Sequence, residues 1–188
     1  LMKYSYILHT PENQLVVADA VNPFEPVTEK NIEKEGFTFT FHHTVKNGYC
    51  ITEVAVSSDS EKEVYFSLHG EGDAKLYSFG GPCFDERIFR QSPHDVTRYH
   101  FKMQRGAIPM VACVTDEITE IVVSDNPSYF DNATTQHIIP AEKCFYLSSG
   151  DKGGAPNFPE SDHFDPIFHK IGGEKKHTFR FVAFRTNV

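Results

Sequence analysis

One polar stretch, residues 125–136, contains side chains of the types that bind sugars. It directly follows an apolar run and carries carboxylates, amides and two neighbouring aromatic residues. Sugar rings pack their C–H faces on aromatic side chains, and their hydroxyl groups hydrogen-bond to acidic and amide groups. We therefore expect ligand-binding residues here, with one of the two aromatic rings as the stacking surface: Asp125, Tyr129, Phe130, Asp131 and Gln136. The alternative, which composition alone favours, is a loop held by Asx turns with both rings buried in the core.

A second polar segment, residues 150–173, has residue types that could bind a metal ion. Its candidate ligands are Asp162, His163, Asp165 and His169. Loop spacing of this kind does not fix a coordination geometry, so we interpret the segment as a solvated loop and predict no metal site. His42 and His43 are adjacent on an expected strand, so their rings point to opposite faces and cannot bind one metal ion together.

No motif in the sequence indicates a catalytic centre. The sequence has neither the Gly-x-Ser-x-Gly turn of serine hydrolases nor the His-Glu-x-x-His helix of zinc proteases, and its glycine-rich segments lack the residues of a phosphate-binding loop. Glycoside hydrolysis needs only two carboxylates at a set separation, and nothing in the spacing selects such a pair. We predict no catalytic residue and no cofactor, and whether the chain belongs to an enzyme stays open at this point.

The clearest structural element is a β-hairpin across residues 37–56. Apolar residues alternate with Thr and His in its first half, and an Asn-Gly pair follows, which is the preferred sequence for a two-residue type I′ turn. A turn of this length places Phe41 opposite Val54 and Phe39 opposite Val56. Aromatic and β-branched residues pair favourably across antiparallel strands.

Further strands are expected at short intervals along the chain. Apolar runs predict them at residues 15–19, 63–69, 97–104, 108–115, 120–124, 143–148 and 177–185. Only residues 29–36 and 88–91 suggest short helical turns. Many short strands joined by turn-forming residues predict an all-β fold, an antiparallel β-sandwich with long loops at residues 125–136 and 150–173.

Length and composition limit the classes of protein to which the chain can belong. Its 188 residues fit one domain, which we expect to span residues 1–188. Trp is absent, but 17 Phe and 8 Tyr supply large side chains for a core. The net charge is −8 and no dense basic patch is present, so we do not expect the chain to bind nucleic acid. No apolar stretch has the length needed to span a membrane.

The four cysteines are Cys50, Cys83, Cys113 and Cys144, and no two of them have the close spacing of a zinc or redox motif. Three of them fall in expected strands. We interpret them as buried free thiols that pack as small apolar side chains, and one disulfide remains an alternative.

The chain resembles the N-terminal β-sandwich (supersandwich) domains that precede an (α/α)6 catalytic barrel in bacterial glycoside hydrolases. The resemblance rests on the strand-rich, Phe- and Tyr-rich pattern and on residues 123–136, VSDNPSYFDNATTQ. Residues 177–188 are similar to the last sandwich strand before the linker to such a barrel. The resemblance implies a fragment of a longer multidomain protein and a periplasmic or secreted location, with the cytoplasm left open.

The resemblance also implies a supporting function. The catalytic acid of such enzymes lies on the helical barrel, so no catalytic residue is carried over to this chain. We therefore expect a non-catalytic accessory domain of a carbohydrate-active enzyme, which packs on its own C-terminal catalytic domain and contributes to oligosaccharide binding. The alternatives are an independent carbohydrate-binding module and a structural or protein-interaction sandwich. A stand-alone enzyme would need a pocket with converging carboxylates.

Overall fold

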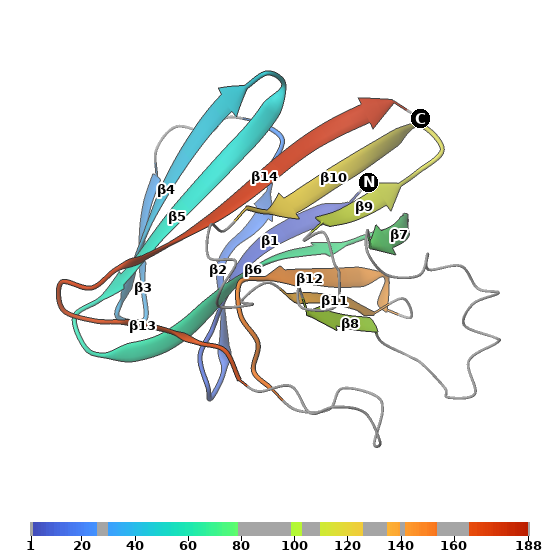
Figure 1. The fold of residues 1–188 in the computed structure, drawn as a ribbon. Helices are drawn as coiled ribbons and strands as arrows, with labels where there is room; N and C mark the ends of the chain where they lie inside the picture. The colour runs from blue at the N-terminus through green and yellow to red at the C-terminus, as the bar shows by residue number, and fades with distance from the viewer. Residues whose placement is uncertain are drawn as a thin grey trace, which may run out of the picture.

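The protein is built from two antiparallel β-sheets that face each other (Figure 1). The computed structural model describes residues 2–25, 30–78, 99–102, 110–125, 135–139, 142–153 and 166–187. None of these residues lies in an α-helix, and their strand pairs are antiparallel. The predicted all-β, antiparallel sandwich is confirmed.

Sheet A has the strand order β2-β1-β6-β12-β11-β8, and β13 pairs with one end of β6. Its strands are β1 (Lys3–His9), β2 (Gln14–Val21), β6 (Lys62–Glu71), β8 (Tyr99–Lys102), β11 (Thr135–Ile139), β12 (Cys144–Ser148) and β13 (His169–Ile171). β1 and β6 lie next to each other in the middle of this sheet although they are far apart in the sequence (Figure 1).

Sheet B has the strand order β3-β4-β5-β14-β10-β9-β7. Its strands are β3 (Lys30–Lys34), β4 (Phe37–Lys46), β5 (Tyr49–Ser58), β7 (Lys75–Ser78), β9 (Met110–Val114), β10 (Ile118–Ser124) and β14 (His177–Asn187). The chain crosses from sheet A to sheet B between β6 and β7, at residues 72–74.

The predicted hairpin is present as β4 and β5 with the expected register. Phe41 pairs with Val54, and Phe39 pairs with Val56. The turn residues Asn47 and Gly48 have φ angles of 52° and 81°, as a type I′ turn requires.

The helical turn predicted at residues 29–36 is wrong, because residues 30–36 form β3 and its turn into β4. Glu35 and Gly36 have φ angles of 51° and 82°, so they make a second tight hairpin turn of the same kind as Asn47-Gly48. The prediction relied on the helix propensity of the Glu and Lys residues. That propensity is weak, and the strand pairing that places Ile32 opposite Phe39 outweighs it. The helical turn predicted at residues 88–91 lies outside the described residues.

The other strand predictions are confirmed as β2, β6, β8, β9, β10, β12 and β14, although β8 is described over four residues only. The strands β1, β7, β11 and β13 were not predicted. Two of them, β11 and β13, overlap the segments that were predicted to be long loops. The segment 125–136 ends inside β11, and the segment 150–173 contains β13 and an isolated bridge between Asp151 and Ile167.

The core between the sheets is rich in aromatic rings. The alternation of β6 points Phe66 inward, where its ring stacks on Phe179 at 5.5 Å between centroids. Tyr6 of β1 packs its ring on Phe66 and on Phe41, at 5.7 and 5.4 Å. These large side chains provide the apolar burial that the absent Trp does not supply.

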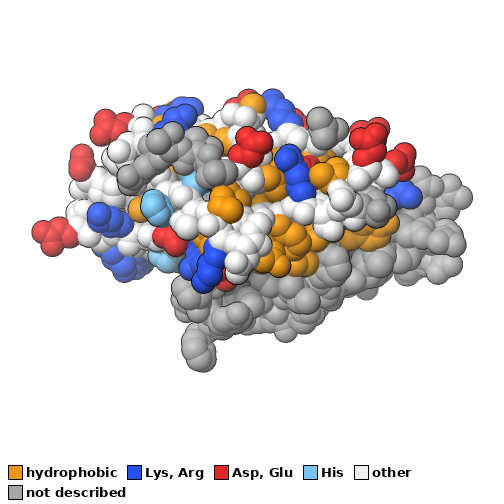
Figure 2. Space-filling view, turned by 90° about the horizontal axis from the view of Figure 1, so that it is seen from above, with side chains coloured by type: hydrophobic (Ala, Val, Ile, Leu, Met, Phe, Trp, Pro, Cys, Tyr) orange, Lys and Arg blue, Asp and Glu red, His pale blue; other side chains and the backbone are white. Residues whose placement is uncertain are grey.

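The outer face of sheet B, which points away from sheet A, carries apolar side chains on neighbouring strands. Val182 of β14 pairs with Ile51 of β5 and with Val123 of β10. One pleat further along, the ring of Phe184 contacts the ring of Tyr49 at 4.9 Å. Figure 2 shows hydrophobic side chains gathered in the middle of the face seen from above.

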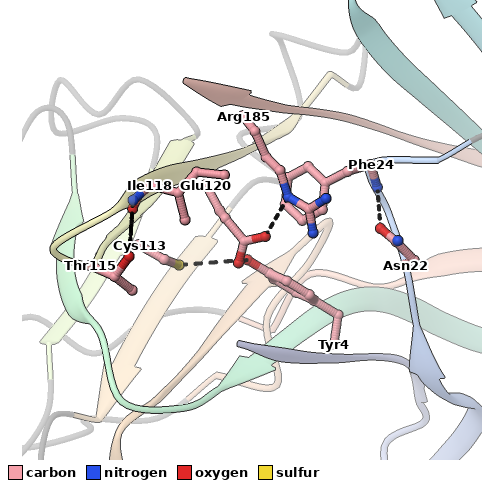
Figure 3. A network of polar contacts seen from close by, with 8 residues as sticks. All are labelled: Tyr4, Asn22, Phe24, Cys113, Thr115, Ile118, Glu120 and Arg185. Carbon is pink, nitrogen blue, oxygen red and sulfur yellow. Dashed lines mark hydrogen bonds and ion pairs between the residues drawn. The ribbon is translucent and has the colours of Figure 1, made fainter. Parts of the chain in front are cut away.

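A buried polar network joins the two sheets (Figure 3). The hydroxyl of Tyr4 in sheet A donates a hydrogen bond to Glu120 Oε1 in sheet B, at 3.2 Å. Arg185 Nε donates to the other carboxylate oxygen of Glu120 at 2.8 Å, and the Arg185 guanidinium lies 4.3 Å from the centre of the Phe24 ring. Glu120 is therefore satisfied although its side chain is almost completely buried.

The described cysteines are buried in strands, as predicted: Cys50, Cys113 and Cys144. Burial raises the pKa of the Cys113 thiol to about 12, and Cys50 shifts in the same direction, so both are protonated thiols at neutral pH. Cys83 lies outside the described residues. No helix in the described ranges is long and apolar enough to cross a membrane.

Candidate functional site

The candidate site is a cluster of histidine and tyrosine rings on the outer face of sheet A, which points away from sheet B. We call it the His/Tyr cluster, and its members are His9, Tyr65, His69, His137 and Tyr146. They come from four neighbouring strands, β1, β6, β12 and β11. Strand alternation produces the cluster, because at least one sequence neighbour of each member is an apolar residue that points into the core.

Strand register aligns three of these side chains in one row across the sheet. His69 pairs with Tyr146, and Tyr146 pairs with His137. The ring centroids of His69 and His137 lie 4.6 and 6.1 Å from that of Tyr146. All three side chains are half-buried, so each keeps part of its surface accessible to a ligand.

The second part of the cluster is a stacked pair of rings that supports the row. The imidazole of His9 stacks on the ring of Tyr65 at 4.2 Å and an interplanar angle of 9°. Both residues are buried, and His9 also contacts Tyr146 edge-on at 6.2 Å. Gly150 lies against Tyr65, and a Cβ at this position would be only 2.4 Å from Tyr65 Cβ. Only glycine therefore allows the chain after β12 to pack so closely on this ring.

Hydrogen bonds fix the orientation of the supporting rings. His9 Nε2 and Ser67 Oγ are 2.7 Å apart, and Ser67 Oγ and Ser148 Oγ are 2.6 Å apart. A serine hydroxyl bonded to an imidazole is also the arrangement of a nucleophile and its base. Ser67 is 0% exposed, however, so no substrate atom reaches its hydroxyl group. The hydrogen bonds that connect His9, Ser67 and Ser148 therefore serve to position the rings.

Burial favours the neutral form of two histidines of the cluster, His9 and His69. Burial lowers the pKa of His9 to about 3, and the positive charge of Lys152, together with that of His69 when it is protonated, acts in the same direction. Burial also lowers the pKa of His69, whereas the carboxylates Glu71, Asp19 and Glu142 partly oppose that shift. Neutral imidazoles can donate one hydrogen bond and accept another, which suits them to bind hydroxyl groups.

The cluster shows no metal-binding arrangement. Among the residues that the structure describes, no group of three or more His, Cys, Asp or Glu side chains could hold a metal ion. His169, one of the residues considered above as a ligand, donates from Nε2 to the carbonyl oxygen of Ser149 at 2.7 Å and stacks on His177 at 4.0 Å. The other three residues considered with it, Asp162, His163 and Asp165, lie outside the described residues.

The sugar-binding residues expected from the sequence are only partly described. Asp125 follows β10 in sheet B and forms an ion pair with Arg180, at 3.1 Å between Oδ2 and Nε. Gln136 lies in β11 of sheet A, and it is 1% exposed among the core residues. The structure thus places Gln136 within sheet A and Asp125 just beyond the end of a strand of sheet B. Tyr129, Phe130 and Asp131 lie outside the described residues, and the predicted sugar site at residues 125–136 stays a prediction.

Sequence reasoning did not identify the His/Tyr cluster. The signal was present in part, because the predicted strand 63–69 sends Tyr65, Ser67 and His69 to the face opposite its apolar residues. The missing information was the order of the strands. Only the pairing of β6 with β12, and of β12 with β11, brings His69, Tyr146 and His137 together.

No protein-family model matches the chain, and no curated protein sequence matches it. Three similar solved structures are a polysaccharide lyase, the Slr1438 protein from Synechocystis and a candidate aldose 1-epimerase from Escherichia coli K12. The polysaccharide lyase has a TM-score of 0.39 and 9% identity, over 100% of this chain and 26% of that chain. Slr1438 has a TM-score of 0.47 and 9% identity, over 81% of this chain and 55% of that chain. The Escherichia coli protein has a TM-score of 0.43 and 10% identity, over 99% of this chain and 66% of that chain. The chain thus spans less than two thirds of each of these three structures.

Proposed function

We propose that the protein binds a glycan at the His/Tyr cluster and acts as an accessory domain of a carbohydrate-active enzyme. The observation that carries the first part is the half-buried Tyr146 ring, which lies between the imidazoles of His69 and His137. The ring offers an apolar surface to the C–H face of a sugar. The neutral imidazole of His69 offers hydrogen bonds to its hydroxyl groups.

The surroundings of the cluster add groups that suit a polyhydroxylated ligand. The carboxylates Asp19, Glu71 and Glu142 lie near enough to His69 to influence its pKa, and they can accept hydrogen bonds from hydroxyl groups. The mixture of aromatic surface and a few polar groups is typical of small-molecule sites. The supporting contacts of His9 and Ser67 hold the rings in place before a ligand arrives, which lowers the entropic cost of binding.

The proposal assigns no catalysis to this chain. The Ser67 hydroxyl, which most resembles an activated nucleophile, is inaccessible. The carboxylates near His69 influence its pKa through their charge, and of two cavities lined by described residues one has only Asp19 of them in its lining and the other has none. Binding without turnover is the function that these groups support best.

The experiment that tests glycan binding is a glycan-array screen of the chain, followed by calorimetric titration of the best ligand. Tyr146→Ala is expected to weaken binding about five- to tenfold, because stacking of a sugar on one aromatic ring contributes on the order of 1 kcal/mol and the row also loses its central contact. Tyr49→Ala is the matched control, because Tyr49 is 45% exposed and lies in sheet B. Equal loss in both variants, or unchanged binding in Tyr146→Ala, would reject this site.

A second observation favours the accessory role, in which sheet B packs on a catalytic domain of the same polypeptide. The apolar side chains Ile51, Val123, Val182 and Phe184 lie side by side on the outer face of sheet B, and none of them is completely buried. Apolar patches of this kind mark interaction surfaces. Co-expression of the chain with the remainder of its polypeptide should give a complex, and Phe184→Asp should dissociate it. Failure of the wild-type pair to associate would contradict the accessory role and leave an independent binding module.

A further inference from the structure

Two carboxylates, those of Glu71 and Glu142, lie beside the His/Tyr cluster without a cation to pair with. Glu71 follows His69 as the next residue of β6 on the outer face of sheet A, and its cross-strand partner is Cys144. Glu142 is also next to Cys144, whose Sγ lies 3.8 Å from Glu142 Oε2. Both glutamates are exposed, and neither forms an ion pair within the described ranges.

The strand register places these carboxylates next to the aromatic surface of the cluster. His69 pairs with Tyr146 and Glu71 pairs with Cys144, so these four residues occupy neighbouring positions on two paired strands. Cross-strand partners and their diagonal neighbours lie within reach of long side chains. The electrostatics agree with this geometry. Burial is the main cause that raises the pKa of the Tyr146 hydroxyl, and the charges of Glu142 and Glu71 add to it.

The lysines nearby are already paired with other carboxylates. Lys3 Nζ lies 3.4 Å from Asp19 Oδ2, and Lys143 Nζ lies 2.8 Å from Asp73 Oδ1. The charge of Lys152 acts on the supporting imidazole of the cluster. Among the described residues, the charge that remains beside the row of rings is therefore negative.

This excess of negative charge distinguishes between classes of glycan. Like charges that flank one position repel each other, and a bound cation relieves the repulsion. A ligand carboxylate would add to the repulsion, and a neutral hydroxyl group would leave it unchanged. Because the neighbouring ring packs on the C–H face of a sugar, the cation has to be part of a sugar, and the ammonium group of an amino sugar meets this requirement.

We propose that the glycan bound at the His/Tyr cluster contains a basic amino sugar, whose free ammonium group pairs with Glu71 and Glu142. The pyranose ring packs on Tyr146, and the imidazole of His69 bonds to a hydroxyl group. This inference rests on the proposed glycan site and specifies the class of its ligand. Glycans that carry uronic acids bind more weakly, because the same two carboxylates repel them.

The test uses four tetrasaccharides that share one backbone and one linkage and differ in charge. They are chitosan tetrasaccharide, chitotetraose, cellotetraose and glucuronan tetrasaccharide, which carry amines, N-acetyl groups, hydroxyl groups and carboxylates. Calorimetric titrations are done at about pH 5.5, where the amines and the carboxylates are charged. The chitosan tetrasaccharide should bind about three- to tenfold more tightly than cellotetraose and chitotetraose, as two exposed ion pairs allow, and glucuronan tetrasaccharide should bind most weakly. High salt should reduce these differences.

Variants connect the preference to the two carboxylates. The Glu71→Gln, Glu142→Gln double variant should bind the chitosan tetrasaccharide no more tightly than cellotetraose, and its affinity for cellotetraose should be that of the wild-type chain. The control is the Glu33→Gln, Glu117→Gln double variant, which changes the net charge equally at exposed positions in β3 and in the turn between β9 and β10. This control should keep the full preference, whereas attraction to the overall charge of the protein would be reduced equally in both variants.

The outcomes separate this inference from the glycan site itself. Suppose that a glycan shifts the backbone amides of residues 67–71 and 144–148. The amino-sugar inference alone is then overturned if cellotetraose or glucuronan tetrasaccharide binds as tightly as the chitosan tetrasaccharide, if none of the four binds, or if the Glu71→Gln, Glu142→Gln variant keeps the preference. If no glycan, from these four or from the array, shifts these residues, both proposals are overturned.

Discussion

The imidazole of His69 and the ring of Tyr146 are cross-strand partners on the outer face of sheet A, with centroids 4.6 Å apart. The two residues are far apart in the sequence, and the pairing of β6 with β12 alone brings them together. Because His137 pairs with Tyr146 on its other side, the tyrosine ring lies in the middle of a row of half-buried rings. This row is the centre of the proposed glycan site.

The buried network between the sheets should contribute strongly to stability. Removing Arg185 leaves the carboxylate of Glu120 buried without its ion-pair partner, so Arg185→Ala is expected to lower the free energy of unfolding by about 3 kcal/mol. Arg180 on the same strand pairs with the partly exposed Asp125, and Arg180→Ala should cost less than about 1 kcal/mol. Urea denaturation of the two variants measures the difference. Equal losses would show that Glu120 does not depend on Arg185.

Stability should depend on pH through His9. Its pKa is lowered to about 3 in the folded protein from 6.5, so the unfolded chain binds a proton more readily than the folded chain between these values. The contribution of His9 is therefore complete above about pH 6.5 and is lost as the pH falls toward 3. His9→Gln should reduce the slope of stability against pH in this window by up to one proton, about 1.4 kcal/mol per pH unit.

The control for this measurement is His42→Gln, which changes an exposed imidazole on β4. The slope should change more in His9→Gln than in this control, because His9 is buried and His42 is exposed. A His9→Gln variant with the wild-type slope would mean that His9 binds a proton as readily in the folded protein as in the unfolded chain, contrary to its burial against Tyr65 and Ser67.

One substitution in the turn between β3 and β4 should raise the stability of the protein. Glu35 has a φ angle of 51°, a left-handed conformation that asparagine adopts at lower cost than glutamate. Glu35→Asn creates a second Asn-Gly turn and is expected to stabilise the protein by about 0.5–1 kcal/mol. Thermal unfolding measures the change, and Asn47→Ala in the other hairpin should shift stability in the opposite direction. A destabilised Glu35→Asn variant would contradict the assigned turn.

The sequence was most informative where the structure is local. The register of Phe41 with Val54 follows from a two-residue turn and a period of two, so it could be predicted without any knowledge of the fold. The strand at residues 30–34 could not be predicted in this way, because its Glu and Lys residues weakly favour a helix. Only pairing with the neighbouring strand β4 makes this segment a strand.

The candidate site could not be predicted from the sequence, because no local pattern marks its residues. His9, Tyr65 and Tyr146 each occupy an ordinary outward position in a strand, and none belongs to a sequence motif. Their contacts arise from the order β1-β6-β12, which depends on long-range pairing.

The most direct test of the proposed function is to locate a bound glycan on the protein by NMR. The chain is titrated with the best glycan from the array, and backbone amide shifts are mapped onto the strands. We expect the largest saturable shifts at residues 67–71, 135–139 and 144–148, around His69, His137 and Tyr146, and their loss in Tyr146→Ala. Shifts confined to sheet B or to residues 125–134, or no glycan binding at all, would contradict the proposal that the His/Tyr cluster is the glycan site.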